Sequence, residues 1–294
     1  MKSNCKIVFL GNPEFSIPTL ENLIKNNYQI IAIITSPDKP VGRKKIITPS
    51  PLKVFAFKKN LPIFQPVDKT EMFELLEKLQ PDLGIVAAFG MILPEKILNI
   101  PKYGFINIHP SLLPRWRGAT PIQNTILYGD EKTGVTLYLM DEKTDHGPII
   151  AQQELNNYES EIVNYKDLSQ KLAELGGNLL IKTLPKFLNN EITLLPQEET
   201  KAINTKKILI EDAFIKLSDL EIAQKQGGEK AIEINRKIKA LNPEPGPWTV
   251  WQGEKPFNFV KNKRMKLLES EINECGKLNL KKIQFEGKNP ISYN

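Results

Sequence analysis

Cysteine is scarce in this sequence, with only two among 294 residues. Cys5 and Cys275 lie far apart, and neither has a second cysteine at a paired spacing. The sequence therefore indicates neither a disulfide framework nor a zinc site, and no metal is expected. This cysteine usage is typical of a reducing compartment, so we expect a cytoplasmic protein.

Long apolar runs are also missing. The run Ile7–Leu10 ends at Gly11 and Pro13, too early for the hydrophobic region of a secretory signal, so none is expected. No uninterrupted apolar stretch approaches the roughly 20 residues that cross a bilayer, and we expect no membrane partner. With 40% hydrophobic and 25% charged residues, the chain has the composition of a globular protein, and its length leaves room for two domains.

The formal net charge of +6 is unevenly distributed along the chain. Residues 1–200 hold 22 basic and 22 acidic side chains, so residues 201–294 carry the whole excess. A second basic region, residues 38–59, has seven lysines and arginines against Asp38 alone. Two basic regions around a neutral remainder favour a large polyanionic partner held at two places. The alternative is a lysine-rich surface that only keeps the protein in solution.

Short β-branched runs alternate with helix-like segments in the first part of the chain. Runs that are apolar on both faces and separated by helices are typical of a mostly parallel sheet covered on both sides. The pattern predicts a doubly wound, Rossmann-like α/β domain over residues 1–188. The expected strands are residues 6–10, 29–35, 82–88, 105–109 and 134–140.

Helix signals support this division. Ser50 is an N-cap before a proline at the first helical position, which predicts a helix through Lys59. Leucines recur at helical spacing between Leu168 and Leu179, which predicts an amphipathic helix over about residues 165–188 that closes the domain.

The remainder of the chain reads as a linker and a smaller domain. Residues 189–205 lose the periodicity and become polar, which predicts a linker. Residues 206–294 contain a helical pattern over roughly 228–240 that stops at Asn242-Pro243, followed by strand-like pieces. They predict a small basic domain built as an OB-like β-barrel.

The segment FINIHPSLLPRWRGATP, residues 105–121, carries the most chemical information. Asn107 and His109 lie two residues apart at the end of an apolar strand, so their side chains share one face. Ligand crevices of open α/β sheets lie at this end of the strands. An amide that can donate to an oxyanion would then stand beside an imidazole that exchanges protons near neutral pH. Alternatively, the two residues only cap a strand.

Asp145, in the segment MDEKTDHGPII, is a third candidate. A carboxylate beside an imidazole favours the imidazolium and fixes its tautomer. The sequence does not establish that Asp145 meets His109, and a loop aspartate flanked by Asp141 and Glu142 is more often solvated surface. Because the chain has only two histidines, a histidine-dependent mechanism must use His109 or His146.

These residues resemble a known family. The pattern N-x-H-x-S-L-L-P-x-x-R-G at 107–118, with its downstream aspartate, is similar to that of formyltransferases that use 10-formyltetrahydrofolate. Six further segments follow the order found in methionyl-tRNA formyltransferases and extend the resemblance along nearly the whole chain. They are VFLGNPEF, TSPDKPVGRKK, TPSPLKVFA, AAFGMILP, NRKIKALNPEPGPW and FEGKNP.

The resemblance implies formyl transfer from 10-formyltetrahydrofolate to the α-amino group of methionyl initiator tRNA, a step that supports translation initiation. It implies that Asn107, His109 and Asp145 are the catalytic trio. The residues that it places at the folate are Ser111, Leu112, Leu113 and Pro114, with Phe89, Gly90, Met91, Ile92 and Leu93 of the FGMILP loop.

The same resemblance implies a role for the basic regions. In this family the loop after the second strand enters the acceptor end of the tRNA, and the small domain contacts the neighbouring stem through backbone charge. The residues implied in these contacts are Arg43, Lys44 and Lys45 in the loop, and Lys206, Lys207, Lys237 and Lys239 in the small domain. We expect a monomer.

The chain departs from the family pattern in three places. Lys143 stands where glycine is common and His146 where threonine is common. His146 is then either a second titrating group beside the site or a benign variant, and we favour the benign variant. The region between Trp251 and Phe285 is shorter than usual, which predicts a reduced barrel with fewer tRNA contacts.

Three alternatives remain. A phosphoribosylglycinamide formyltransferase shares the N-x-H and D-H-G-P-I-I elements, but it lacks the basic loop and the C-terminal domain. A formyltetrahydrofolate hydrolase domain usually has a dehydrogenase partner, which is absent from this sequence. A non-catalytic RNA-binding protein would explain the charge and leave the trio without a purpose.

Overall fold

The computed structural model describes residues 5–42, 45–156, 158, 163–252 and 262–293. The chain divides into two compact units. The first consists of Met1–Ala119, Lys132–Asn156 and Ser169–Asn204, and the second of Thr120–Glu131, Asn157–Leu168 and Thr205–Asn294. The segment that the sequence predicts as a linker thus contributes residues 189–204 to the first unit.

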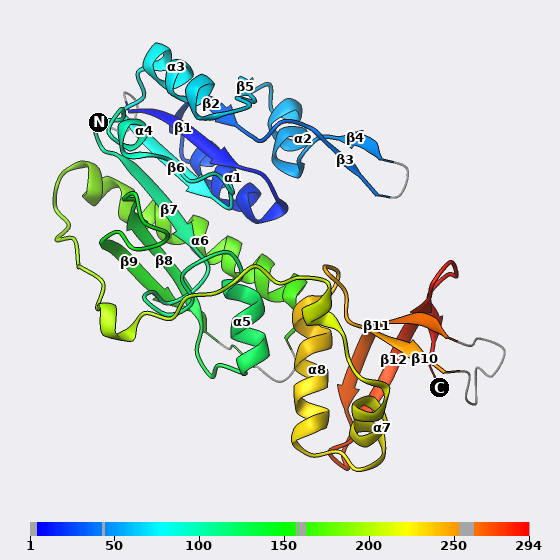
Figure 1. Ribbon diagram of the computed structural model, residues 1–294. Helices are drawn as coiled ribbons and strands as arrows, with labels where there is room; N and C mark the ends of the chain where they lie inside the picture. The colour runs from blue at the N-terminus through cyan, green and yellow to red at the C-terminus, as the bar shows by residue number, and fades with distance from the viewer. Residues whose placement is uncertain (1–4, 43–44, 157, 159–162, 253–261, 294) are drawn as a thin grey trace. The chain divides into compact units, whose positions relative to one another are not determined.

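A seven-stranded sheet forms the centre of the first unit, in the order β5-β2-β1-β6-β7-β8-β9 (Figure 1). Strands from β5 to β7 pair in parallel, and β8 and β9 pair antiparallel at one edge. The mostly parallel doubly wound sheet predicted from the sequence is therefore confirmed. Its strands are β1 (Lys6–Gly11), β2 (Gln29–Ile34), β5 (Ile63–Phe64), β6 (Leu83–Ala87), β7 (Phe105–His109), β8 (Gly134–Leu139) and β9 (Ile149–Glu154).

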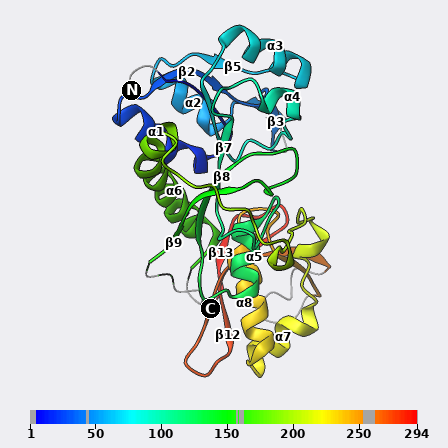
Figure 2. The same cartoon turned by 90° about the vertical axis from the view of Figure 1, so that its left-hand side faces the viewer.

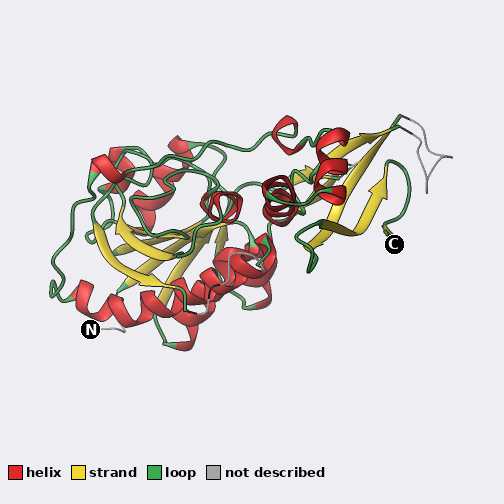
Figure 3. Cartoon of the chain, turned by 90° about the horizontal axis from the view of Figure 1, so that it is seen from below, coloured by secondary structure: helices red, strands yellow, loops and turns green. Residues whose placement is uncertain are grey.

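Helices cover the sheet on both sides, as Figure 3 shows. They are α1 (Ile17–Lys25), α2 (Pro51–Lys58), α3 (Lys69–Leu79), α4 (Glu95–Leu98) and α6 (Tyr165–Leu188), with a short 3₁₀ turn, η1 (Glu14–Ser16), before α1. The predicted N-cap is present in α2, where the Ser50 hydroxyl accepts from the Lys53 backbone N–H at 3.2 Å. The predicted helix over 165–188 is α6.

Two adjacent glycines allow α6 to lie close to its neighbours. A Cβ on Gly176 would come within 2.6 Å of the Ile108 side chain in β7, and one on Gly177 would come within 3.1 Å of the Thr19 Cα in α1. Helices α1 and α6 therefore lie side by side, as seen in Figure 2. This close approach supports the strand that carries Asn107 and His109.

The carboxyl ends of β1, β6 and β7 meet at one edge of the sheet. The chain runs outward from β1 through β2 to β5 and then returns to β6, so the strand order reverses between β1 and β6. Open α/β sheets bind ligands at such a switch point. Here the Asn12 side chain, after β1, donates to the Phe89 carbonyl oxygen, after β6, at 2.5 Å.

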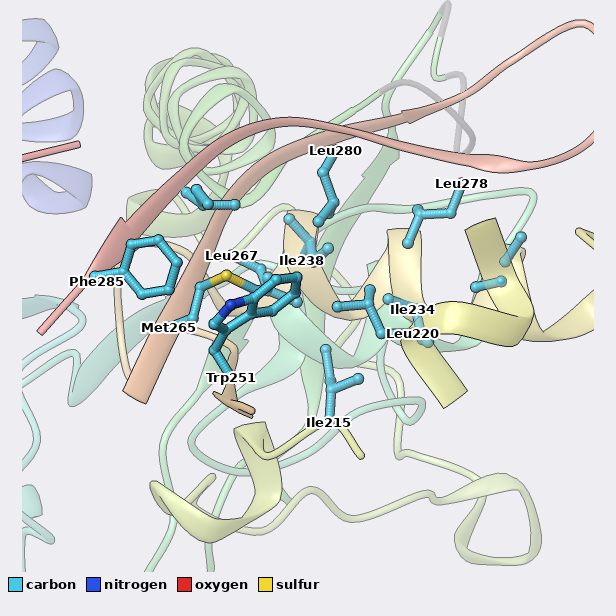
Figure 4. Close-up of a cluster of buried hydrophobic side chains, with 13 residues drawn as sticks. Ile215, Leu220, Ile234, Ile238, Trp251, Met265, Leu267, Leu278, Leu280 and Phe285 are labelled. Carbon is cyan, nitrogen blue, oxygen red and sulfur yellow. The ribbon is translucent and has the colours of Figure 1, made fainter. Parts of the chain in front are cut away.

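The second unit contains a four-stranded antiparallel sheet, which is consistent with the predicted small barrel-like domain. Its strands are β10 (Trp248–Trp251), β11 (Lys263–Ile272), β12 (Leu278–Phe285) and β13 (Ile291–Ser292). Figure 4 shows its core, in which Trp251, Met265, Leu267 and Phe285 of the sheet face Ile238 of a helix.

The helices of this unit are α5 (Pro121–Tyr128), α7 (Leu217–Lys225) and α8 (Glu229–Leu241). The predicted helix over 228–240 is α8, and α7 was not predicted, because its apolar residues form no clear stripe. The expectation of a shortened barrel concerns a region that includes residues 253–261, which lie outside the described residues.

Candidate active site

Asn107 and His109 are the third and last residues of β7, at the carboxyl edge of the sheet. Residues two apart in a strand project from the same face, so the two side chains stand together as expected. The His109 side chain is 4% exposed, whereas Asn107 is half-buried between buried neighbours. The amide is thus accessible while the imidazole is enclosed.

Asp145 reaches this pair from the loop between β8 and β9. Its backbone has a φ of 49°, in the left-handed region. One carboxylate oxygen, Oδ2, accepts from the Gly118 backbone N–H at 2.6 Å and lies 3.6 Å from His109 Nδ1. The side chain is only 12% exposed, so a solvated position, the alternative from the sequence, does not describe it.

The tautomer of His109 follows from its second nitrogen. Nε2 lies 2.9 Å from the Trp116 carbonyl oxygen, which can only accept, so Nε2 carries a hydrogen. This arrangement turns Nδ1 toward Asp145 Oδ2. Protonation of Nδ1 would complete an ion pair that is largely withdrawn from water.

Tyr138 is a site residue that the sequence did not predict. It pairs with Asn107 across β7 and β8, and its hydroxyl lies 3.0 Å from Asn107 Nδ2 and 2.7 Å from Asp145 Oδ1. Burial raises the pKa of the Tyr138 hydroxyl well above its ordinary value, and the Asp145 carboxylate raises it further. The apolar run at 134–140 predicted a strand, but the register in which it pairs with β7 was not visible in the sequence.

Arg117 fastens the segment that holds His109 and Asp145. Its guanidinium donates to both Glu199 carboxylate oxygens, at 3.0 and 2.7 Å, and its Nε donates to Gln197 Oε1 at 3.0 Å. Gln197 in turn donates to the Asp145 and Gly147 carbonyl oxygens. The 3₁₀ turn η2 (Glu199–Lys201) therefore supports the site from a segment about 80 residues further along the chain.

The loop after β7 holds the four residues expected at the folate. The Ser111 hydroxyl donates to the Arg115 carbonyl oxygen within the loop, and the Leu113 side chain is buried beside Tyr138. Thr136 and Gln152, on β8 and β9, bind the loop backbone at positions 111 and 113. Of these four residues, Leu112 and Pro114 are half-buried and leave part of their side chains accessible to a ligand.

The FGMILP loop after β6 has two faces. Phe89 and Leu93 are buried in the core of the first unit. Gly90 is exposed with a φ of 84°, Met91 is half-buried and the Ile92 side chain is 64% exposed. Gly90, Met91 and Ile92 are therefore the members of this loop that can meet a ligand, while the other two anchor it.

The first part of the chain matches the family described as "Formyl transferase" over residues 5–184. The whole chain is also similar to proteins named methionyl-tRNA formyltransferase. It is 41% identical to the one from Bacillus cytotoxicus over 98% of this chain and 93% of that protein. The chain belongs to the methionyl-tRNA formyltransferase family. The relative from Chloroflexus aurantiacus is 39% identical over 87% of this chain and 79% of its own length.

Solved structures share the fold of this family member at lower identity. A 4-N formyltransferase from Francisella tularensis superimposes with a TM-score of 0.62 at 24% identity, over 84% of this chain and 93% of that one. HypX from Aquifex aeolicus in complex with tetrahydrofolic acid gives a TM-score of 0.65 at 16% identity, over 98% of this chain and 45% of its own.

In this formyltransferase family member, one predicted tRNA-binding residue lies in a described hairpin. The hairpin consists of β3 (Lys39–Val41) and β4 (Ile46–Thr48), and exposed Lys45 precedes β4. Arg43 and Lys44 lie outside the described residues. A network of Lys53, Asp38 and Gln65 fastens the base of the hairpin, with Lys53 Nζ 2.7 Å from Asp38 Oδ2.

The basic residues predicted in the second unit differ in availability. Lys206 and Lys207 are exposed. Lys237 is half-buried, and its ammonium donates to the Phe214 carbonyl oxygen at 2.9 Å. Burial lowers the pKa of Lys237. Lys206 and Lys207 are thus freer to contact a polyanion than Lys237.

His146 lies apart from the cluster of Asn107, His109 and Asp145 and binds other partners. Its Nδ1 binds Asp141 Oδ2, and its Nε2 lies 3.4 Å from Glu199 Oε1, on the carboxylate that Arg117 binds. The Arg117 guanidinium lowers the pKa of Glu199.

Across the described part of the chain, no group of three metal-ligating side chains is placed to hold a metal ion. In the same residues, no helix is long and apolar enough to cross a membrane.

Proposed function

We propose that this protein transfers the formyl group of 10-formyltetrahydrofolate to the α-amino group of methionyl initiator tRNA, in the cytoplasm and as a monomer. The observation that carries the proposal is the cluster of Asn107, His109 and Asp145 at the carboxyl edge of the sheet. It occurs in a chain whose relatives of about 40% identity are named methionyl-tRNA formyltransferases.

The chemistry of the cluster suits this reaction. The donor supplies the formyl carbon, to which the amine nitrogen bonds while the bond to N10 of the folate breaks. The second hydrogen of Asn107 Nδ2 stabilises the negative charge that develops on the formyl oxygen, and one such donor is worth roughly 3–4 kcal/mol in barrier height. The His109 imidazole is 4% exposed and its Nε2 hydrogen is bound to the Trp116 carbonyl oxygen at rest, so this hydrogen becomes the second donor only when the ligand displaces that oxygen.

Asp145 is the proton acceptor in this proposal. Its carboxylate is largely enclosed, with Oδ1 and Oδ2 each accepting one hydrogen bond. It takes the proton from the attacking amine and returns it to the leaving N10, so no net proton is gained or lost by the protein. We propose no metal in this reaction.

The two loops after β6 and β7 fit a folate. They follow adjacent parallel strands, so they lie at the same edge of the sheet. Their accessible side chains, Met91, Ile92, Leu112 and Pro114, are apolar and suit the flat pterin ring, whereas Phe89, Leu93 and Leu113 hold the loops in place. Gly90 has no side chain and would contact the ligand through its backbone. Ser111 is buried, with its hydroxyl on the Arg115 carbonyl oxygen and its own carbonyl oxygen bound by Thr136, so in this proposal it shapes the loop.

The basic regions would position the tRNA. We propose that the hairpin with Arg43, Lys44 and Lys45 enters the acceptor end, and that Lys206 and Lys207 of a C-terminal domain at 206–294 contact backbone phosphates. A catalytic domain at 1–188 would then hold both reacting groups. Such contacts weaken as the salt concentration rises.

The experiment that tests the function offers competing acceptors. The purified protein is incubated with labelled 10-formyltetrahydrofolate and either methionyl initiator tRNA or glycinamide ribonucleotide. We expect label only on the tRNA, as N-formylmethionine. Label on glycinamide ribonucleotide, or release of formate without an acceptor, would overturn the assignment. Methionyl elongator tRNA is the control for initiator selectivity. Equal use of both tRNAs would contradict that selectivity and leave formyl transfer to methionyl-tRNA standing.

A further inference from the structure

Tyr138 contacts all three residues of the predicted catalytic trio. Its hydroxyl lies 2.7 Å from Asp145 Oδ1 and 3.0 Å from Asn107 Nδ2, and its ring meets the His109 ring edge-on with centroids 6.5 Å apart. We propose that Tyr138 is a positioning residue for formyl transfer, and that its hydroxyl orients the Asn107 amide. This inference rests on the function proposed above for the trio.

The Tyr138 hydroxyl keeps its hydrogen. The side chain is 2% exposed, and burial together with the Asp145 charge raises its pKa well above the ordinary value. At any pH where the trio works, the hydroxyl has one hydrogen to donate and lone pairs that accept.

The direction of the two hydrogen bonds follows from this single donor hydrogen and the accepting lone pairs. The Asp145 carboxylate only accepts, so the Tyr138 hydrogen is committed to Oδ1 and the hydroxyl oxygen can only accept from Asn107. The amide must therefore turn its nitrogen toward Tyr138. The flipped amide would place Oδ1 of Asn107 against the hydroxyl oxygen, with no hydrogen between two acceptors.

This orientation decides what Asn107 offers a ligand. The side chain is half-buried, and its amide makes no other hydrogen bond to the described residues. The second hydrogen on Nδ2 is therefore available as a donor. Without the Tyr138 hydroxyl the amide is free to rotate by half a turn, and it would then present an oxygen that repels the charge developing on the formyl group.

The same hydroxyl also holds Asp145. With Oδ1 bound to Tyr138, the other oxygen faces the Gly118 N–H and His109 Nδ1. The Tyr138 hydroxyl thus orients both the Asn107 amide, the proposed donor, and the Asp145 carboxylate, the proposed proton acceptor. The strand pairing of β7 and β8 supplies the register, because Tyr138 lies directly opposite Asn107.

The variant that tests this inference is Tyr138→Phe. It keeps the ring beside Leu113 and Ile149 and removes only the hydroxyl. We expect kcat to fall about 10- to 100-fold, as for a small misplacement of reacting groups, while KM for 10-formyltetrahydrofolate changes by less than about threefold. Tyr28→Phe is the matched control, since Tyr28 is also buried but precedes β2, at the opposite edge of the sheet.

A second measurement does not depend on any acceptor. The side-chain amide of Asn107, labelled with ¹⁵N and assigned with the Asn107→Ala variant, is followed by NMR in the free protein. In the wild type and in Tyr28→Phe we expect two resolved amide hydrogens, one of them protected from solvent exchange. In Tyr138→Phe we expect the protection to fall by at least about tenfold, because that hydrogen loses its partner.

The two measurements separate the possible failures. If the Asn107 amide is equally protected in Tyr138→Phe, the inference is overturned whatever acceptor is used. It is also overturned if kcat stays within twofold of the wild type, or if Tyr28→Phe lowers kcat as much. If the wild type transfers no formyl group to methionyl-tRNA but the amide responds as expected, the proposed function fails and the orienting role of Tyr138 stands.

Discussion

Replacing Arg117 by alanine should loosen residues 116–118, the segment that supports His109 and Asp145 in the candidate active site. Arg117 stands between Trp116, whose carbonyl oxygen binds His109, and Gly118, whose N–H binds Asp145. Its own backbone N–H donates to the Ile203 carbonyl oxygen at 2.8 Å, and its buried guanidinium binds η2. The substitution removes the side-chain hydrogen bonds of Arg117 and leaves its backbone hydrogen bond to Ile203 in place.

Arg117→Ala removes three contributions to the free energy that opposes local unfolding of this segment. The Arg117 side chain is 5% exposed. Alanine keeps Cβ, so the substitution removes two buried methylenes, Cγ and Cδ, whose burial contributes about 1.6 kcal/mol. The hydrogen bond to Gln197 adds about 1 kcal/mol. The ion pair with Glu199 adds only about 0.5 kcal/mol, because the Glu199 side chain is 61% exposed and solvent screens the charge. We therefore expect a local loss of about 3 kcal/mol, or less where the cavity collapses.

Hydrogen exchange measured by mass spectrometry suits this prediction, because it reports the opening of individual segments. A loss of about 3 kcal/mol accelerates exchange roughly 100-fold or more in peptides that cover residues 105–118 and 197–204. Formyl transfer should fall about 10- to 100-fold in the same variant, since His109 and Asp145 lose their fixed supports.

Two controls make the result specific. Glu199→Gln keeps an acceptor for Arg117 and loses only the charge, so its peptides should exchange within a fewfold of the wild type. Lys132→Ala removes an exposed ion pair with Glu154 in the same unit and should change nothing. If Arg117→Ala exchanges as slowly as Lys132→Ala in both segments, the Arg117 side chain does not stabilise them and the prediction is refuted.

Three further predictions concern single sites. His109→Ala should abolish turnover and leave folate binding, measured by titration, largely intact; near-normal turnover would remove His109 from the mechanism. Gly134→Ala should lower the free energy of unfolding by about 1–3 kcal/mol in urea, because its Cβ would lie 2.2 Å from the Gln153 carbonyl oxygen; an unchanged midpoint would contradict this contact. Burial raises the pKa of the Cys5 thiol from 9.0 to about 11, so the folded state keeps this proton after the unfolded chain has lost it. Stability should therefore be unaffected below pH 9 and fall by up to about 3 kcal/mol towards pH 11, and urea unfolding of Cys5→Ala should lack this part of the slope.

Much of the fold was predictable because it follows local patterns. The runs at 6–10 and 105–109 are apolar on both faces, and they form buried central strands. Ser50 and the following proline marked the start of α2, and the leucine stripe marked α6. The short strand β5, with only two residues, and α7, with a weak stripe, carry too little local signal for such a prediction.

The placement of the basic residues was less predictable. A lysine pattern indicates charge but not which ammonium groups remain free. Lys237 is drawn onto the Phe214 carbonyl oxygen, whereas Lys206 stays exposed, and only the fold of the second unit separates the two. His146 was likewise visible as a titratable residue. Its partner Asp141 lies in the same loop, but its second partner, Glu199, depends on the position of η2.

The sequence by itself determined that Asn107 and His109 stand together, since a strand repeats every two residues and both lie in one strand. The family motifs likewise depend only on residue order. The tertiary structure alone decided which residues complete the site. Asp145, Tyr138 and Glu199 reach Gly118, Asn107 and Arg117 across 27, 31 and 82 residues. Contacts at such separations depend on strand register and chain crossing, which local periodicity does not encode.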